Sequence, residues 1–187
     1  NQTIGFENIE LILVDDKSDD DYTICILEKI DKMYSNSKVI ILEEHTGFPG
    51  LPRNVGFENS TGDYVIFMGS DDTYSLDALE VMYNFAIEED VDFIFSSFTK
   101  IFKDRVEFFQ HPDFEEGDIY RASSIDENTD FLKLQPSLWT KLFKREFLVK
   151  NNIWSVEGVN AQDMEFVLHS YLCAENFVYL SKFSSYN

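Results

Sequence analysis

Four short runs of the chain are almost continuously apolar, and segments with helical spacing lie between them. The runs are IELILVDD (Ile9 to Asp16), KVIILEEH (Lys38 to His45), DYVIFMGSDD (Asp63 to Asp72) and VDFIFSSF (Val91 to Phe98). Unbroken apolar runs are typical of strands that are covered on both faces of a sheet. We therefore predict four strands, each ending near polar or small residues.

Apolar residues recur at helical spacing in two of the intervening segments, Tyr22 to Tyr34 and Leu76 to Glu89. A shorter helix is predicted from Pro52 to about Asn59, because proline suits the first turn of a helix and Gly62 lies just beyond its end. Strands that alternate with helices indicate an α/β domain with a mostly parallel sheet flanked by helices.

The alternation of predicted strands and helices stops after residue 100. The segment 103–136 is rich in acids and lacks the alternation, so we expect irregular structure over one side of the same domain. Helical spacing returns over Leu138 to Asn151 and Asp163 to Glu175, and Phe177 to Leu180 is predicted as a final strand. No segment has the composition of a flexible linker between domains. We therefore expect one domain over residues 1–187.

Composition narrows the classes of partner. The chain has 187 residues, 44% of them apolar, and a formal net charge of −20. Nucleic-acid binding relies on clustered Lys and Arg, so DNA, RNA and anionic membrane surfaces are not expected as primary partners. Cys25 and Cys173 both fall in apolar helical patterns, which predicts small buried residues in place of a disulfide framework and fits a reducing compartment. These features predict a cytoplasmic protein.

Two of the apolar runs end in adjacent aspartates, Asp15–Asp16 and Asp71–Asp72. In open α/β sheets, ligands bind beyond the carboxyl ends of the strands. Carboxylates from two strand ends could hold a divalent cation, and the cation could hold a diphosphate. Each pair, taken alone, also fits a solvated turn.

Four segments, in this order, resemble the family 2 glycosyltransferases, which are inverting enzymes of the GT-A fold with nucleotide-sugar donors. The segments are ENIELILVDDKSDD, GLPRNVGFENSTGDYVIFMGSDD, WTKLFKREFLVKNNI and AQDMEF. The resemblance spans about Glu7 to Leu180. It implies a GT-A-like, Rossmann-like α/β fold, with a nucleotide-sugar-binding half at residues 1–100 and an acceptor-side half at residues 101–187 that carries the base.

The resemblance also implies roles on the donor side. Asp15 or Asp16 would contact the uracil or ribose of the donor, and Arg53 would meet the nucleotide. Asp71, with Asp72 nearby, would bind the Mn²⁺ or Mg²⁺ that bridges the donor diphosphate. The sequence departs from the family's Asp-x-Asp motif at residue 69, where a glycine occupies the position of the first aspartate.

On the acceptor side, the resemblance makes Asp163 the general base that takes the proton from the acceptor hydroxyl, and it places Trp139 and Lys141 beside the acceptor. Each residue also has a simpler interpretation. An acid in the first turn of a helix is stabilised by the helix dipole. An aromatic residue at the edge of a helical segment usually packs against its neighbours.

The expected function is transfer of a sugar, with inversion, from a nucleotide-diphosphate donor of the UDP type to a polysaccharide, teichoic-acid-like or lipid-linked acceptor. A non-catalytic GT-A domain that binds a sugar nucleotide or a partner is the alternative, and Gly69 favours it. An acidic cation-binding module is a second alternative. Members of the family begin with an apolar strand that lies centrally in the sheet, and this sequence, which starts at Asn1, contains no matching strand. We therefore expect a gap in the sheet that is lined by open strand edges. We expect the domain to self-associate or to distort so that the gap is covered, and peripheral membrane association through missing regions is a separate expectation.

Overall fold

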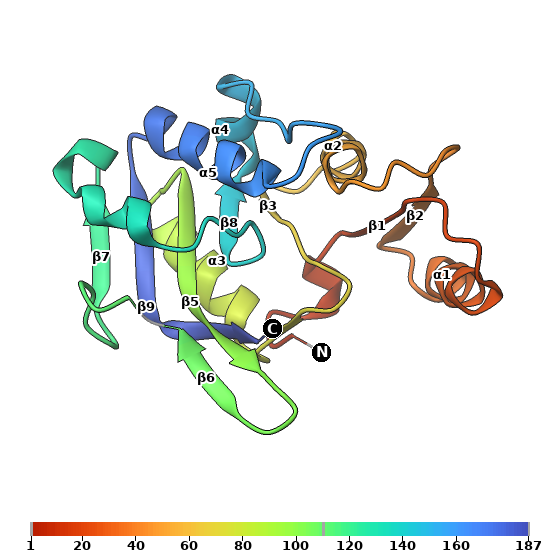
Figure 1. Ribbon diagram of the computed structural model, residues 1–187, viewed down its shortest axis with the longest axis horizontal. Coiled ribbons are helices and arrows are strands. Elements are labelled where there is room, and N and C mark those ends of the chain that lie inside the picture. Colours follow the sequence, from red (N-terminus) through yellow and green to blue (C-terminus); the bar gives the residue numbers. More distant parts are fainter. Residues whose placement is uncertain (1, 110, 187) are drawn as a thin grey trace.

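The computed structural model describes residues 2–109 and 111–186, except for the side chains of residues 182–186. Its elements follow one another in a βα order that becomes mostly strands in the second half (Figure 1). The helices are η1 (Phe6–Asn8), α1 (Asp21–Met33), α2 (Gly50–Glu58), α3 (Ala78–Glu88), η2 (Ile125–Glu127), η3 (Thr129–Lys133), α4 (Arg145–Lys150) and α5 (Gln162–Cys173). The strands are β1 (Leu11–Asp15), β2 (Ser37–Ile41), β3 (Tyr64–Ile66), β4 (Thr73–Tyr74), β5 (Phe93–Ile101), β6 (Val106–Phe109), β7 (Ile119–Ala122), β8 (Lys141–Lys144) and β9 (Phe177–Tyr186).

The strands form two sheets. β1 and β2 make a parallel two-stranded sheet, and the larger sheet has the order β3-β8-β5-β9-β4, with β6 on β5 and β7 on β9. Within the larger sheet β5 and β9 are parallel, and the other described pairs are antiparallel. The prediction of an α/β fold with flanking helices is confirmed. The prediction of a mostly parallel sheet is wrong, because β8 enters antiparallel between β3 and β5.

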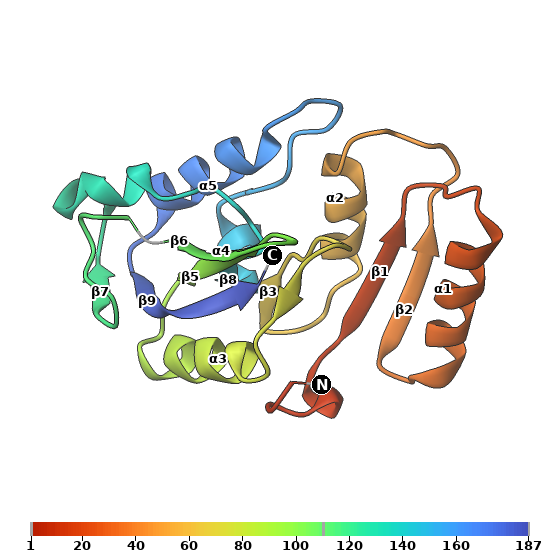
Figure 2. The same cartoon turned by 60° about the horizontal axis from the view of Figure 1, so that its bottom comes forward.

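The larger sheet is covered on both faces, by α3 on one side and by α4 and α5 on the other (Figure 2). Successive side chains of β5 point to opposite faces of the sheet, because side chains alternate along a strand. Phe93 and Phe95 belong to an aromatic cluster under α5, and Ile94 belongs to a second cluster under α3. All three are at most 2% exposed, which explains the unbroken apolar run in the sequence.

The predicted helix over Leu138 to Asn151 is wrong in its first half. Residues 141–144 form β8, and only residues 145–150 are helical. The apolar positions Leu142, Phe143, Phe147 and Leu148 fit either element locally. The open edges of β3 and β5 decide between them, because β8 pairs with both strands and satisfies their backbone groups.

β1 and β3 lie beside one another but do not pair (Figure 2). Within the described residues, β1 pairs with β2 alone and β3 with β8 alone. The two sheets are linked at one end by Glu10, whose carboxylate accepts hydrogen bonds from Thr61 N (2.7 Å) and Gly62 N (3.2 Å). The open strand edges expected from the sequence are therefore present. None of the described helices is long and apolar enough to cross a membrane.

Candidate functional site

Arg53 and Asp163 form an ion pair that joins α2 to the first turn of α5. The Arg53 guanidinium contacts Asp163 Oδ1, and Leu138 N–H donates to Asp163 Oδ2 (3.3 Å). The two charged side chains keep 23% and 27% of their surface exposed. Asp163 is therefore held from two sides while its carboxylate stays accessible. This contact brings together two predicted site residues that lie 110 positions apart.

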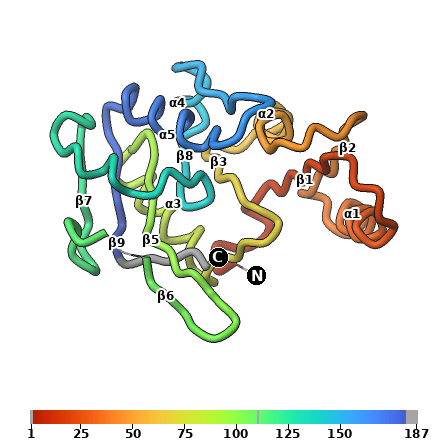
Figure 3. Tube along the Cα trace, in the orientation of Figure 1, coloured from red at the N-terminus to blue at the C-terminus, as the bar shows by residue number. Residues whose placement is uncertain are grey.

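The loop between α4 and α5 lies against α2 and fixes this geometry (Figure 3). Asn54 clamps the loop: its Nδ2 donates to Ser155 O (2.9 Å), and its Oδ1 accepts from Ser155 N (2.9 Å). A Cβ at Gly50 would overlap the Val156 carbonyl oxygen, so glycine permits this close approach. The sequence alone predicts no role for Asn54. Its place directly after Arg53 was the available signal.

Two residues within two positions of predicted site residues adopt left-handed backbone conformations. Ala161 (φ 60°) immediately precedes α5, and Lys17 (φ 63°) immediately follows Asp16. This conformation costs a non-glycine residue about 1–2 kcal/mol. Such strain persists where the surrounding structure imposes it, and it is often found at functional sites.

Gly69, Asp71 and Asp72 form a turn between β3 and β4. A Cβ at residue 69 would lie 2.8 Å from Asp72 Oδ2 and 3.0 Å from Asp71 Oδ1, so glycine leaves room for both carboxylates. Burial raises the pKa of the Asp72 carboxyl, and the neighbouring charge of Asp71 raises it further. Two carboxylates crowded together in this way fit a divalent cation, which would relieve their repulsion.

This turn does not supply a complete coordination sphere. The described residues contain no group of three or more His, Cys, Asp or Glu side chains arranged to hold a metal. Mg²⁺ commonly takes one or two carboxylates from the protein and its remaining ligands from water and substrate phosphates. The residues present therefore fit a cation that is shared with a phosphate-bearing ligand.

Tyr74 connects the carboxylate turn to the loop 135–140. Its hydroxyl donates to Trp139 O (2.7 Å), and burial raises the pKa of this phenol. The loop also carries Leu138, whose N–H meets Asp163. The turn with Asp71 and Asp72 is thus linked through the loop to the Arg53–Asp163 pair. Tyr74 was not predicted, although it lies two residues after the acid pair.

Lys141 lies behind the same loop and is 1% exposed. Its Nζ donates to Gln135 O (3.2 Å), Ser137 O (2.8 Å) and Thr140 Oγ1 (3.3 Å). Burial lowers the pKa of this amine to about 7. The family resemblance predicts Lys141 beside the acceptor. The structure instead buries its side chain inside the protein, where its hydrogen bonds support the loop.

Trp139 belongs to the same loop and is partly buried. Its ring meets the Phe98 ring edge-on, with 5.0 Å between the centroids. The packing interpretation is confirmed, whereas contact with the acceptor stays a prediction.

Asp15 and Asp16 lie apart from this group, at the carboxyl end of β1 in the smaller sheet. Asp15 accepts hydrogen bonds from the Ser18 backbone N (2.8 Å) and Oγ (2.6 Å). Asp16 accepts from Thr46 N and Gly47 N (both 2.9 Å). Burial acts to raise the pKa of the Asp16 carboxyl, but these hydrogen bonds outweigh it and lower that pKa. Both carboxylates therefore already order the loops at this end of the sheet.

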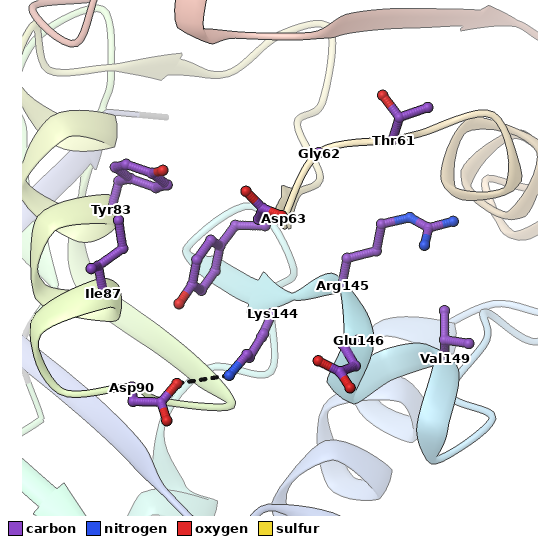
Figure 4. Close-up of a pocket in the computed structure, with 11 residues that line it drawn as sticks. Thr61, Gly62, Asp63, Tyr83, Ile87, Asp90, Lys144, Arg145, Glu146 and Val149 are labelled. Carbon is purple, nitrogen blue, oxygen red and sulfur yellow. Dashed lines mark hydrogen bonds and ion pairs between the residues drawn. The ribbon is translucent and has the colours of Figure 1, made fainter.

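A cavity of about 480 Å³ lies away from all of these residues (Figure 4). It is found at the start of β3, whereas Asp71 follows the end of that strand. Lys144 crosses it to pair with Asp90 (2.7 Å). The cavity contains none of the predicted site residues, and we do not assign the reaction to it.

The fold and the site together define an α/β protein with acidic strand ends and a carboxylate, Asp163, held in the first turn of α5 by Arg53 and the Leu138 N–H. The chain belongs to glycosyl transferase family 2, whose family model matches residues 1–153.

Two curated relatives cover nearly all of the chain. It is 30% identical over 179 residues to the poly(ribitol-phosphate) β-N-acetylglucosaminyltransferase TarP of Staphylococcus aureus, covering 95% of this chain and 52% of TarP. It is 32% identical over 185 residues to a poly(ribitol-phosphate) β-glucosyltransferase of Bacillus spizizenii, covering 94% of this chain and 26% of that protein. The chain therefore spans about half, or less, of the length of these relatives.

Solved structures of Staphylococcus aureus TarS superpose on the whole chain. TarS 1–349 matches with a TM-score of 0.83 and 27% identity, over 99% of this chain and 52% of that one. Its complex with UDP-GlcNAc matches with a TM-score of 0.82 and 26% identity, over 100% of this chain and 51% of that one. This likeness confirms the GT-A-like fold.

Proposed function

We propose that this protein transfers a sugar from a UDP-sugar to a hydroxyl group of a teichoic-acid-like polymer or another polysaccharide, with inversion at the sugar carbon. The observation that carries the proposal is the placement of Asp163, between Arg53 and the Leu138 N–H, in a site tied through Tyr74 to the carboxylate turn. Relatives named for transfer to poly(ribitol-phosphate), and a TarS complex with UDP-GlcNAc, support the choice of substrates.

Asp163 acts as the general base in this proposal. Inversion requires that the acceptor oxygen attack from the face opposite the leaving diphosphate, and its proton must leave as the new bond forms. A carboxylate held by two donors and still partly exposed is suited to receive that proton. Arg53 offers the positive charge that a diphosphate leaving group needs.

Asp71 and Asp72 would hold Mn²⁺ or Mg²⁺ at the turn, with Asp71 as the main ligand. The bound ion would supply positive charge that offsets the charge developing on the leaving diphosphate. We propose that Asp15 and Asp16 contact the nucleotide end of the donor. The ordered loops after β1 and β2 would form that end of the site.

On the acceptor side, Trp139 would contact the acceptor, while Lys141 supports the loop from within. We also propose a cytoplasmic location, with peripheral membrane association or self-association through regions that cover the open edges of β1 and β3. Lipid-linked acceptors remain within the proposed substrate class.

A non-catalytic role is favoured by one observation, the glycine at residue 69. Its lack of a side chain removes one carboxylate from the turn, which could leave a domain that binds a sugar nucleotide without turning it over. The two functions differ in the predicted effect of Asp163→Asn. That change lowers the rate of transfer about 10²–10⁴-fold in an enzyme, whereas a non-catalytic binding domain has no transfer for it to lower.

The test uses the full-length protein and titrates UDP with and without Mn²⁺ in a calorimeter. UDP and Mn²⁺ are expected to strengthen each other's binding, because each is a ligand of the other. Asp71→Ala should remove this coupling, and the matched control Asp126→Ala, an exposed acid on η2, should keep it. Metal binding that is indifferent to UDP would instead support a simple cation-binding module.

A further inference from the structure

The β5–β6 hairpin carries an aromatic surface that continues from the loop beside Asp163. The Phe98 ring lies 5.0 Å from the Trp139 ring and 4.8 Å from the Phe109 ring, centroid to centroid. Lys100 Nζ lies 4.9 Å from the Phe109 centroid. We call these four residues the hairpin platform. The hairpin extends beyond the body of the sheet (Figure 1).

The hairpin platform lies on one face of the hairpin. Phe98 and Phe109 are cross-strand partners, and Lys100 follows Phe98 by two residues, so all three side chains point to the same side. Phe98 is 4% exposed and forms the buried floor of the hairpin platform, whereas Phe109 is 46% exposed and presents its ring to solvent. An exposed aromatic ring of this kind offers a flat apolar surface to a ligand.

The hairpin platform starts next to the proposed reaction centre. Trp139 directly follows Leu138, whose N–H contacts the Asp163 carboxylate. From Trp139 a chain of contacts runs through the buried Phe98 ring to Phe109 and Lys100. A polymeric acceptor whose reacting hydroxyl lies at Asp163 could therefore place its more distant units on the hairpin.

The charge of the hairpin contrasts with that of the whole chain. The protein has a formal net charge of −20, yet Lys100 and Lys103 pair with no carboxylate among the residues whose side chains are described. Glu107 is the cross-strand neighbour of Lys100, but Arg105 Nε holds it at 2.6 Å. Lys100 thus keeps a positive charge beside an aromatic ring, available to an anion.

We propose that the hairpin platform binds an anionic acceptor polymer of polyol phosphate units, at units remote from the reacting hydroxyl. A phosphate of the polymer lies at Lys100, and the C–H surface of its polyol lies against Phe109 and Trp139. The inference rests on the proposed function for its substrate class. It adds a binding region for the acceptor on a hairpin that the transfer reaction itself does not require.

The hairpin platform would act on long acceptors alone. Binding energy from parts of a substrate that do not react lowers KM when it is equal in the ground state and the transition state. An acceptor that reaches Asp163 but is too short to reach Lys100 should have a KM that does not depend on the hairpin. A long polymer should lose its KM advantage when the hairpin platform is altered.

A binding experiment tests the hairpin platform without relying on turnover. A fluorescent oligomer of eight or more ribitol phosphate units is titrated with the full-length protein and followed by anisotropy. Lys100→Glu and Phe109→Ser should each weaken binding about fivefold, as expected for one exposed contact. The matched control Lys29→Glu makes the same charge change on α1, far along the chain, and should leave the affinity unchanged.

The outcomes separate this proposal from the proposed function. Oligomer binding that is weakened by both hairpin variants supports the hairpin platform even if the protein binds no UDP and transfers no sugar, in which case the transfer proposal alone fails. No binding of the oligomer by the unaltered protein, or unchanged affinity in both hairpin variants, overturns the hairpin platform. Equal binding of a neutral glucan oligomer, insensitive to Lys100→Glu, overturns the phosphate assignment at Lys100.

Discussion

Replacing Asp163 by asparagine should tighten UDP binding while it strongly slows transfer. Without ligand, the Arg53 guanidinium is paired with the Asp163 carboxylate, so a diphosphate must compete for it. Both side chains are about a quarter exposed, and an ion pair at that exposure is worth about 1 kcal/mol. Asparagine removes the competing charge. The affinity for UDP should therefore rise by up to about fivefold.

The same change removes the general base. Loss of general-base catalysis typically lowers the rate by about 10²–10⁴-fold, so kcat should fall in that range. The assay pairs calorimetry of UDP in the presence of Mn²⁺ with initial rates on a polymer acceptor. Asp90→Asn is the control, because it also breaks an ion pair, to Lys144 (2.7 Å), at the other end of β3. Asp90 has φ 47°, a conformation that asparagine tolerates well.

A weaker affinity for UDP in Asp163→Asn, with stability retained, would refute this reasoning. Arg53→Met supplies a second check, since it should weaken UDP binding in either background. In the double variant, Asp163→Asn should give no further gain, because its effect acts through Arg53. An additive gain would show that Asp163 opposes UDP directly, and not through the ion pair.

The remaining predictions concern stability, measured by urea unfolding. Lys141 has a pKa of about 7 in the folded protein, so between pH 7 and 10.5 it holds fewer protons when folded than when unfolded. The free energy of unfolding, measured relative to Lys141→Met, should therefore rise across that window by about 1 kcal/mol per pH unit. A difference that does not change with pH would contradict burial of a neutral amine. Asn54→Ala should cost about 1–3 kcal/mol, because it leaves the Ser155 backbone groups without their partners; a change near zero would show that water replaces them. Tyr171→Phe should stabilise by about 1 kcal/mol, since the buried Tyr171 hydroxyl has no hydrogen-bond partner within the described part of the chain; a loss of stability would reveal one. Ala161→Gly should relieve left-handed strain and leave stability unchanged or higher by about 1 kcal/mol, whereas a clear loss would mean that the strain is absent.

Local patterns in the sequence were sufficient wherever an element is specified by its own residues. The predicted apolar runs overlap β1, β2, β3 and β5, and the predicted helical spacing matches α1, α3 and α5, because burial along a strand or along one helical stripe imposes a period on the chain. The expected coverage on both faces holds for β5 but is wrong for β1 and β2, whose residues are mostly half-buried or exposed. The same reasoning located acidic pairs at two strand ends. The family resemblance then singled out Arg53, Asp71 and Asp163, which occur within short quoted motifs.

The tertiary structure decided whatever depends on partners distant in the sequence. Residues 141–144 carry a pattern that suits a helix or a strand, and the unpaired edges of β3 and β5 made them a strand. The same pairing buried Lys141. The contacts from Arg53 to Asp163 and from Tyr74 to Trp139 span 110 and 65 positions, so no local period can encode them. By itself, the sequence determined the class of fold and the chemical groups at the strand ends. Only packing determined which of those groups meet, because a contact across the fold depends on every element between its two ends.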